Sequence, residues 1–261
     1  MAPPVLDIRD LRTRIRTGAG VLTVVDDVSL RIEHGETLAL VGESGCGKSL
    51  LALSVIGLLP AGAEVVSGEV WFEGRDLLRE TAAHLRSVRG SGIATVFQGP
   101  SSSLNPVLTV GEQIVERLRL NEGKRGADLR GAAIEALREV GIPDPEERVN
   151  WHPHQLSVGM CQRVCIAMAL SGRPTLLIAD EPTSALDVTV ASQVMAVLGQ
   201  LRSRRALSTL LISHDLRAVE SVADRVAVMY AGQIVEMAAT REFFDSPLHP
   251  YSEALLACGT P

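Results

Sequence analysis

The stretch GESGCGKS, residues 42–49, limits the possible folds of this 261-residue chain more than any other feature. It fits the pattern G-x-x-x-x-G-K-[ST], follows the apolar run TLALV and opens the apolar run LLALSVIGLL. A buried strand, a glycine loop and a helix in this order predict a phosphate-binding loop, because glycines let backbone N–H groups wrap closely around an anion. Leu50 stands where a dinucleotide-binding fingerprint has its third glycine, so that alternative is excluded.

We expect this loop to hold the phosphates of a nucleotide, with Lys48 reaching the outer phosphates and Ser49 ligating Mg²⁺. The predicted contacts are Gly42, Glu43, Ser44, Gly45, Cys46, Gly47, Lys48, Ser49 and Leu50.

Composition narrows the class of protein. Apolar residues make up 46% of the chain, which is typical of a globular protein and not of a disordered one. A net charge of −6 argues against nucleic acid as the main partner. The longest apolar run is too short for a membrane span, and the N-terminus does not read as a secretory signal, so we expect a cytoplasmic protein. The spacing of Cys46, Cys161, Cys165 and Cys258 fits no zinc pattern and predicts free thiols.

The order of elements predicts an α/β fold. The first hundred residues are strand-rich, with a hairpin at GEVWFEGRDL and a buried strand at IATVFQ. Thr109 and Glu112 form a capping box, and Leu129, Ala133 and Leu137 share one face of a later helix. The helix VCIAMAL, 164–170, is apolar all round and should be buried. From TLLIADE to RVAVMYAGQIVE strands and helices alternate, which indicates a parallel sheet covered by helices.

Several apolar strands end in polar residues that suit phosphate chemistry. LLIADE, 176–181, ends in Asp180, which suits Mg²⁺ binding, and in Glu181, which suits a base that polarises the attacking water; the alternative is a solvated acidic turn. LLISHD places His214 after a strand, either as a contact to the γ-phosphate or as a structural histidine. Gln98 ends IATVFQ in the same way, with a surface amide as the alternative.

These pieces in this order resemble the ATP-binding-cassette (ABC) ATPases over about residues 5–256. In that family GESGCGKS corresponds to Walker A, Gln98 to the Q-loop, LSVGM (156–160) to the signature, LLIADE to Walker B, SALD (184–187) to the D-loop and His214 to the switch histidine. VFQGPSSSLNPVLTVGEQI, HPHQLSVGMCQRV and SPLHPYSEALL resemble the dipeptide, oligopeptide and nickel importer ATPases more narrowly.

The resemblance implies a P-loop NTPase fold with a mostly parallel core sheet, an antiparallel β subdomain and an inserted helical subdomain. It implies an antiparallel β and Walker A part at 1–99, the helical subdomain with the signature at 100–172, the rest of the α/β core at 173–240 and a short C-terminal segment at 241–261.

The resemblance also implies the reaction, attack of water on the γ-phosphate of MgATP. Glu181, His214 and Gln98 are then the catalytic residues, and the Mg²⁺ ligands are Ser49, Gln98 and Asp180. Two cassettes pack head to tail in this family, so Ser157 and Gly159 would contact ATP bound to the partner.

The implied partners are a second ABC ATPase subunit, identical or different, two membrane permease subunits and an extracytoplasmic substrate-binding protein, with no nucleic acid. The chain would lie at the cytoplasmic face of the inner membrane. Peptides are the first choice of cargo and nickel or a metal chelate the second. A soluble ABC protein and a regulatory subunit that hardly hydrolyses ATP remain as alternatives of other classes.

The chain departs from the family pattern at several positions. Val158 replaces the first glycine of the signature, and either weakens the phosphate cradle or packs on its own domain. Cys161 and Gly99 stand where a polar residue and an aspartate are usual. Ile15 occupies the place of the aromatic residue that stacks on adenine, so apolar contact alone would hold the base. Only Cys258 lies in the region where many relatives bind an iron–sulfur cluster, so we predict no cluster.

Overall fold

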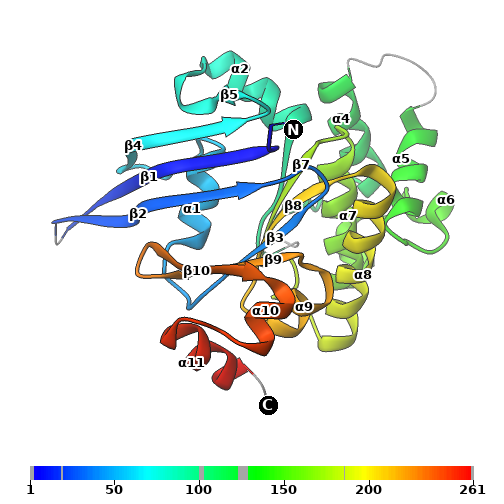
Figure 1. Cartoon of the computed structure of the whole chain (residues 1–261). Helices are drawn as coiled ribbons and strands as arrows, with labels where there is room; N and C mark the ends of the chain where they lie inside the picture. Colours follow the sequence, from blue (N-terminus) through cyan, green and yellow to red (C-terminus); the bar gives the residue numbers. More distant parts are fainter. Residues whose placement is uncertain (1–2, 19, 100–102, 123–128, 185, 260–261) are drawn as a thin grey trace. The chain divides into compact units, whose positions relative to one another are not determined.

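A computed structural model describes residues 3–18, 20–99, 103–122, 129–184 and 186–259 (Figure 1). The chain divides into two compact units, residues 1–85 with 208–261 and residues 86–207. The phosphate loop belongs to the first unit, and most of the long helices belong to the second. The subdomain boundaries that the resemblance implies at residues 100, 172 and 241 remain a prediction.

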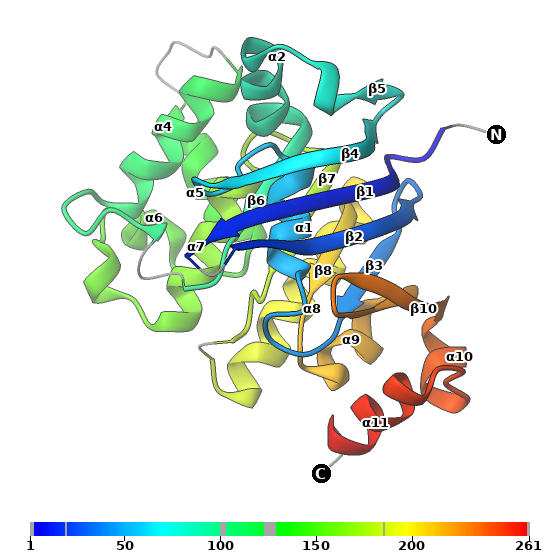
Figure 2. The same ribbon diagram turned by 90° about the vertical axis from the view of Figure 1, so that its left-hand side faces the viewer.

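An antiparallel sheet of the first unit contains, in spatial order, the strands β2 (Gly20–Ile32), β1 (Leu6–Thr17), β4 (Ala63–Phe72) and β5 (Arg75–Asp76). Leu6 of β1 pairs with Ile32 on one side and with Phe72 on the other. β4 and β5 are joined by a tight turn at Glu73 and Gly74, both at positive φ, which confirms the predicted hairpin. Figure 2 shows β4, β1 and β2 side by side with α1 (Lys48–Val55) behind them.

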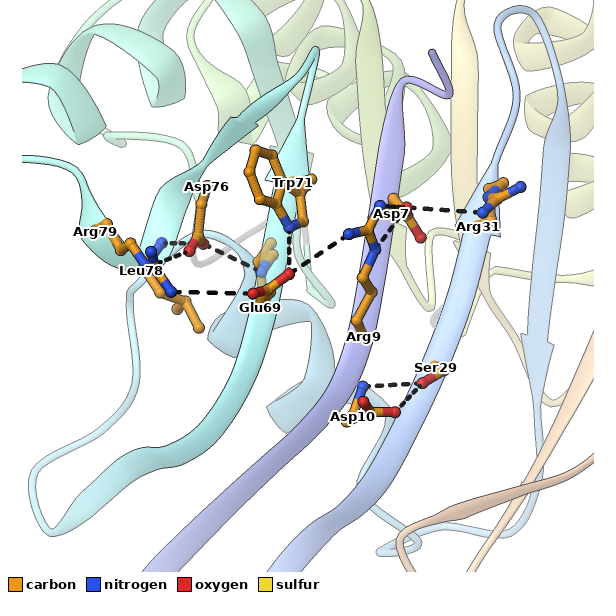
Figure 3. Close-up of polar contacts among 11 residues, drawn as sticks. Asp7, Arg9, Asp10, Ser29, Arg31, Glu69, Trp71, Asp76, Leu78 and Arg79 are labelled. Atoms are coloured by element: carbon orange, nitrogen blue, oxygen red, sulfur yellow. Dashed lines mark hydrogen bonds and ion pairs between the residues drawn. The ribbon is translucent and has the colours of Figure 1, made fainter.

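One face of this sheet carries a network of polar and aromatic side chains (Figure 3). The guanidinium of Arg9 on β1 lies 5.5 Å from the ring centre of Trp71 on β4 and 3.5 Å from the carboxylate of Glu69. On the other side of β1 the N–H of Asp10 donates to the Ser29 hydroxyl of β2 at 2.9 Å. Exposed ion pairs contribute little to stability, so we assign these contacts to holding β1 in register.

The first unit has a second group of strands, ordered β10 (Gln233–Ala239), β9 (Arg225–Tyr230), β3 (Thr37–Val41) and β8 (Ser208–Ile212). β3 runs parallel to both β8 and β9, and all five of its residues are buried, as expected of a strand covered on both faces. RVAVMYAGQIVE differs from the predicted strand–helix alternation. Ala231 and Gly232, with φ of 48° and 87°, form a tight turn that reverses the chain, so β10 is antiparallel to β9.

The remaining helices of the first unit are α9 (Leu216–Val222), α10 (Thr240–Asp245) and α11 (Pro250–Gly259). Asp215 caps α9, because its Oδ1 accepts the backbone N–H groups of Arg217 and Ala218 at 3.1 and 3.2 Å. α10 and α11 follow β10 at the C-terminal end of the chain (Figure 1). In the ranges that the structure describes, no helix combines the length and the apolar character that a bilayer span requires.

The second unit contains a parallel strand pair, β6 (Ile93–Val96) and β7 (Leu176–Asp180), in which Ile93 pairs with Leu176 and Val96 with Ala179. The longer helices of this unit are α4 (Val110–Glu122), α5 (Leu129–Glu139), α7 (Val158–Leu170) and α8 (Val188–Arg205). Its shorter helical segments are η2 (Val88–Gly92), α6 (Pro145–Arg148) and η3 (Pro153–Gln155), while η1 (Leu77–Arg79) and α2 (Ala82–Ser87) precede them in the chain.

The helix signals in this part of the sequence are confirmed. The Thr109 hydroxyl accepts the N–H of Glu112 at 3.2 Å, and the Glu112 carboxylate accepts the N–H of Thr109 at 2.7 Å, which completes the capping box of α4. Leu129, Ala133 and Leu137 are all buried on one face of α5. The apolar residues of α7 are mostly buried as predicted.

Leu137→Ala tests the packing of α5. The side chain is fully buried, so its truncation should lower the free energy of unfolding by about 2–5 kcal/mol, measured by chemical denaturation. Leu120→Ala on α4 is the matched control, because Leu120 is 71% exposed and its loss should cost less than about 0.5 kcal/mol. Equal effects of the two changes would contradict the assigned core.

Candidate nucleotide-binding site

The phosphate loop connects the buried strand β3 to α1 and depends on glycine at two positions. Gly42 and Gly47 have φ of 148° and 113°, which side-chain-bearing residues rarely adopt. A Cβ on Gly42 would lie 2.2 Å from the carbonyl oxygen of Met229, and one on Gly47 would lie 2.3 Å from that of Val24. The loop therefore packs directly against backbone at both of its ends, and a larger residue would displace it.

Lys48 folds back onto the loop that precedes it. Its Nζ donates to the carbonyl oxygens of Gly42 and Glu43, both at 2.8 Å, and lies 3.6 Å from the Sγ of Cys46. The residue is only 6% exposed. A buried ammonium at the N-terminus of a helix is a positive charge held in one place, which suits an anion that binds to the loop.

The start of α1 adds backbone donors to that charge. Gly47 is the N-cap residue and supplies no side-chain hydrogen bond, and the first bond inside the helix runs from the Leu51 N–H to the Gly47 carbonyl at 2.8 Å. The N–H groups of residues 48–50 precede that bond, as at any helix start. Such N–H groups and the helix dipole attract phosphate. Ser49 is exposed there, as a ligand of a phosphate-bound cation must be.

Strand register brings His214 to the same edge as the loop. Leu40 of β3 pairs with Ile212 of β8 in a parallel ladder, so Gly42 and His214 both lie two residues beyond a paired position. The Ser213 N–H extends the ladder by donating to the Leu40 carbonyl at 3.3 Å. His214 is exposed. Its position at the end of β8 agrees with the predicted γ-phosphate contact, which stays a prediction.

Ile15 lies on the antiparallel sheet, in cross-strand register with Leu22 of β2. Leu22 is 57% exposed, and Ile15 is half-buried. The register of β1 and β2 shifts at Val24, two residues further along β2, and it is the Val24 carbonyl that approaches Gly47. β2 thus connects the apolar pair Ile15 and Leu22 to the phosphate loop, so an adenine base predicted at Ile15 would also meet Leu22.

In the second unit the parallel register of β6 and β7 brings Gln98 and Glu181 together. Both residues lie two positions beyond the pair Val96 and Ala179, and the Gln98 Nε2 donates to the Glu181 Oε2 at 3.0 Å. Glu181 has φ of 48°, an uncommon value for a residue other than glycine and one that is often found at functional positions. Asp180, one residue earlier, ends β7 and is 8% exposed.

The predicted signature forms the start of α7. Ser157 is its N-cap, and the serine hydroxyl accepts the N–H of Met160 at 3.3 Å. A Cβ on Gly159 would lie 2.2 Å from the Cγ1 of Val190 on α8, so glycine is required there by packing. Cys161 is buried, and its thiol donates to the Pro153 carbonyl at 3.4 Å; burial raises the pKa of this thiol.

Val158 occupies the first helical position of α7 and is 45% exposed. The side chain is therefore partly covered within its own unit and partly exposed. A helical backbone suits any L residue, so valine does not distort the position of the N–H groups here. What valine adds is bulk beside those N–H groups, facing solvent.

Two contacts of the site were not predicted from the sequence. Tyr251 on α11 accepts a hydrogen bond from the backbone N–H of Glu43 in the phosphate loop at 2.9 Å, and Val190 packs on Gly159. The segment SPLHPYSEALL, which contains Tyr251, resembles the importer ATPases, but nothing in its sequence indicates a contact with the phosphate loop. Of the predicted D-loop SALD, Ala185 lies outside the described residues.

Gly159→Ala tests the fit between α7 and α8. Because the added Cβ would overlap Val190, we expect the free energy of unfolding to fall by about 1–3 kcal/mol, measured by chemical denaturation. Gly199→Ala in the interior of α8 is the control: its Cβ meets nothing within 4 Å, so the change should stabilise the protein by about 0.5–1 kcal/mol. Stabilisation by both changes would rule out the close approach at Gly159.

Known proteins with this sequence pattern and fold are numerous. A protein of Brucella abortus (strain 2308), named for peptide import as an ATP-binding protein, is 49% identical over 97% of this chain and 76% of its own length. The dipeptide transport ATP-binding protein DppD of Haemophilus influenzae is 45% identical over 96% of this chain and 76% of its own length. The two proteins thus match nearly all of this chain.

A solved structure gives the same result for the fold. The ATP-binding cassette MJ0796, a dimer in a post-hydrolysis state with ADP and Pi, is 27% identical and superposes with a TM-score of 0.79 over 90% of this chain and 99% of its own. This confirms the predicted P-loop NTPase fold. The family model described as ABC transporter matches residues 25–184, from β2 through the phosphate loop, signature and Walker B strand. The chain belongs to the ABC transporter family, as one of its ATP-binding cassettes.

Proposed function

We propose that this chain is the ATP-binding and ATP-hydrolysing subunit of an importer for peptides. The observation that carries the proposal is the buried Lys48 ammonium, held by two loop carbonyls at the uncapped start of α1. The names of the relatives at 45–49% identity support peptides over nickel as the cargo.

The residues of the loop supply what a triphosphate needs. The Lys48 ammonium has three N–H donors: two stay with the carbonyl oxygens of Gly42 and Glu43, and the third is directed to the outer phosphates. The N–H groups at the start of α1 bind the remaining phosphate oxygens. Ile15 and Leu22 provide apolar contact for the base. The absence of an aromatic residue between residues 12 and 25 leaves the phosphates as the main source of affinity.

The proposed cation ligands are chemically suited to Mg²⁺. Ser49 offers a hydroxyl, Gln98 an amide oxygen and Asp180 a carboxylate, all hard oxygen donors of the kind that Mg²⁺ prefers. When bound, Mg²⁺ would neutralise charge that develops on the phosphates. These three residues also leave coordination positions for phosphate oxygens and water, as is usual for this ion.

Glu181 acts as the base in the proposed hydrolysis. Its carboxylate accepts a hydrogen bond from Gln98, which orients it, and the other oxygen is then directed to the attacking water. A carboxylate that takes the proton of this water lowers the barrier to attack on the γ-phosphorus. His214, at the end of β8, contacts the γ-phosphate.

A second cassette completes the site in this proposal. The N–H groups of Val158 and Gly159 at the start of α7 and the Ser157 hydroxyl face the ATP of the facing subunit, so ATP joins the two chains until it is hydrolysed. Two permease subunits in the membrane and an extracytoplasmic substrate-binding protein complete the importer. The chain then lies at the cytoplasmic face of the inner membrane.

Lys48→Ala and Glu181→Gln test the two halves of the reaction. Loss of the Lys48 ammonium should weaken MgATP binding about ten- to a hundred-fold, as expected for charged hydrogen bonds to phosphate. Glu181→Gln keeps the shape but not the base, so it should bind MgATP normally and hydrolyse it about a hundred-fold more slowly. Calorimetry and single-turnover hydrolysis measure the two effects.

Arg241→Ala serves as the control, because this side chain is 92% exposed and belongs to α10. Unchanged affinity in Lys48→Ala would refute the nucleotide site. Normal hydrolysis in Glu181→Gln would show that another group is the base. A parent chain that binds MgATP but does not hydrolyse it would support the regulatory alternative.

Val158→Gly tests the unusual signature. The bulk of valine beside the first N–H groups of α7 should hinder closure on the facing ATP, so its removal should raise the ATPase rate of the assembled transporter up to about ten-fold. The gain should belong to the ATP on the facing subunit's Walker A loop, and should vanish when that loop's lysine is replaced. An unchanged rate with both sites intact would show that valine is harmless there.

A further inference from the structure

The segment SPLHPYSEALL, which the ATPase reaction leaves without a role, is firmly anchored to β10. Glu236 of β10 accepts the backbone N–H groups of Leu248 and His249 through its two carboxylate oxygens, at 2.9 Å each. Glu236 is 8% exposed. Burial by itself raises the pKa of Glu236, but the neighbouring Ser252 hydroxyl and these two N–H groups together outweigh it and the pKa is lowered, so the carboxylate stays charged at neutral pH. These two hydrogen bonds to Glu236 fix the position at which α11 begins.

α11 then places Tyr251 against the phosphate loop. The Tyr251 hydroxyl accepts the Glu43 N–H at 2.9 Å, and its ring lies 4.5 Å from the ring of Tyr230, the last residue of β9. The bonds to Glu236 fix the backbone just before Tyr251, and the ring contact holds the Tyr251 side chain. All of these residues belong to the first unit of the chain.

The peptide group held by Tyr251 is the one that also holds Lys48. The N–H of Glu43 and the carbonyl of Gly42 belong to the same planar peptide, and in a trans peptide they point in opposite directions. Tyr251 binds the N–H at one side, and the Lys48 Nζ binds the carbonyl at the other, at 2.8 Å. Rotation of this peptide would withdraw one of the two acceptors of the lysine.

Gly42 makes such a rotation possible. It has φ of 148° and directly follows the last residue of β3, so the sheet no longer restrains the plane that follows it. The Gly232 N–H donates to the Cys46 carbonyl at 3.0 Å, but this bond holds the later part of the loop. Within the described residues the N–H of Glu43 has Tyr251 as its hydrogen-bond partner.

We propose that Tyr251 is a positioning residue for the phosphate loop, through which the C-terminal segment sets the orientation of the Gly42–Glu43 peptide and thereby of Lys48. This role rests on the proposed function of the loop in binding ATP. The bond is made before phosphate arrives, and phosphate then holds the loop through its own contacts. The hydroxyl therefore favours binding and leaves the hydrolysis rate at saturating ATP unchanged.

Tyr251→Phe removes only the hydroxyl and keeps the ring on Tyr230. The dissociation constant for MgATP, measured by calorimetry on the full chain, should rise about two- to ten-fold, the range of one neutral hydrogen bond. The hydrolysis rate at saturating MgATP and the melting temperature without nucleotide should stay at the parent's values. Tyr230→Phe is the matched control, because the Tyr230 hydroxyl makes no hydrogen bond in the described part of the chain, and it should leave all three quantities unchanged.

Lys48→Ala, measured beside them, separates the two claims. Strong loss of affinity in Lys48→Ala with a change of less than two-fold in Tyr251→Phe would overturn the positioning role alone. Equal loss in Tyr251→Phe and Tyr230→Phe, or a lower melting temperature that accounts for the loss in Tyr251→Phe, would overturn it too. Unchanged affinity in Lys48→Ala would overturn the nucleotide site itself.

Discussion

The two hydrogen bonds from the Lys48 ammonium to the carbonyl oxygens of Gly42 and Glu43 are the interaction on which the rest of the site depends. A buried cation needs acceptors, and here they come from backbone that only glycine permits to take this path. The packing of Gly42 on Met229 and of Gly47 on Val24 then fixes the loop between β9 and β2. Met229 and Val24 therefore both help to position the Lys48 ammonium, and a change at either residue should shift it.

Parallel register does the remaining positioning. Within the first unit it brings His214 level with Gly42, and within the second it brings Gln98 level with Glu181. In both cases the polar residue lies two positions beyond the last pair, where the strand has ended and the side chain is no longer buried in the sheet. The pairing of parallel strands thus brings polar residues together at the carboxyl edge of a sheet, although no single strand determines which residues meet there.

The sequence predicted those features whose cause is local. The phosphate loop, the Thr109–Glu112 capping box and the buried face of α5 each depend on residues a few positions apart, and each is present as expected. The reversal at Ala231 and Gly232 was not predicted. An apolar strand has the same sequence pattern whether it pairs parallel or antiparallel, and alanine is an unusual residue for positive φ. Contacts between distant segments were also beyond prediction: Tyr251 reaches Glu43 across 208 positions, and Val190 makes Gly159 obligatory from another helix.

Alkylation of Cys46 tests most directly whether this loop is the nucleotide site. Cys46 lies inside the loop and is partly exposed, whereas Cys258 is exposed near the end of α11 and serves as an internal reference. The rates at which a maleimide modifies the two thiols are measured by mass spectrometry with and without MgATP. We expect MgATP, at a concentration well above its dissociation constant, to cover the loop and slow modification of Cys46 about ten-fold or more, and to leave the rate at Cys258 unchanged. Equal rates at Cys46 with and without saturating MgATP would contradict the assignment of this loop as the nucleotide site.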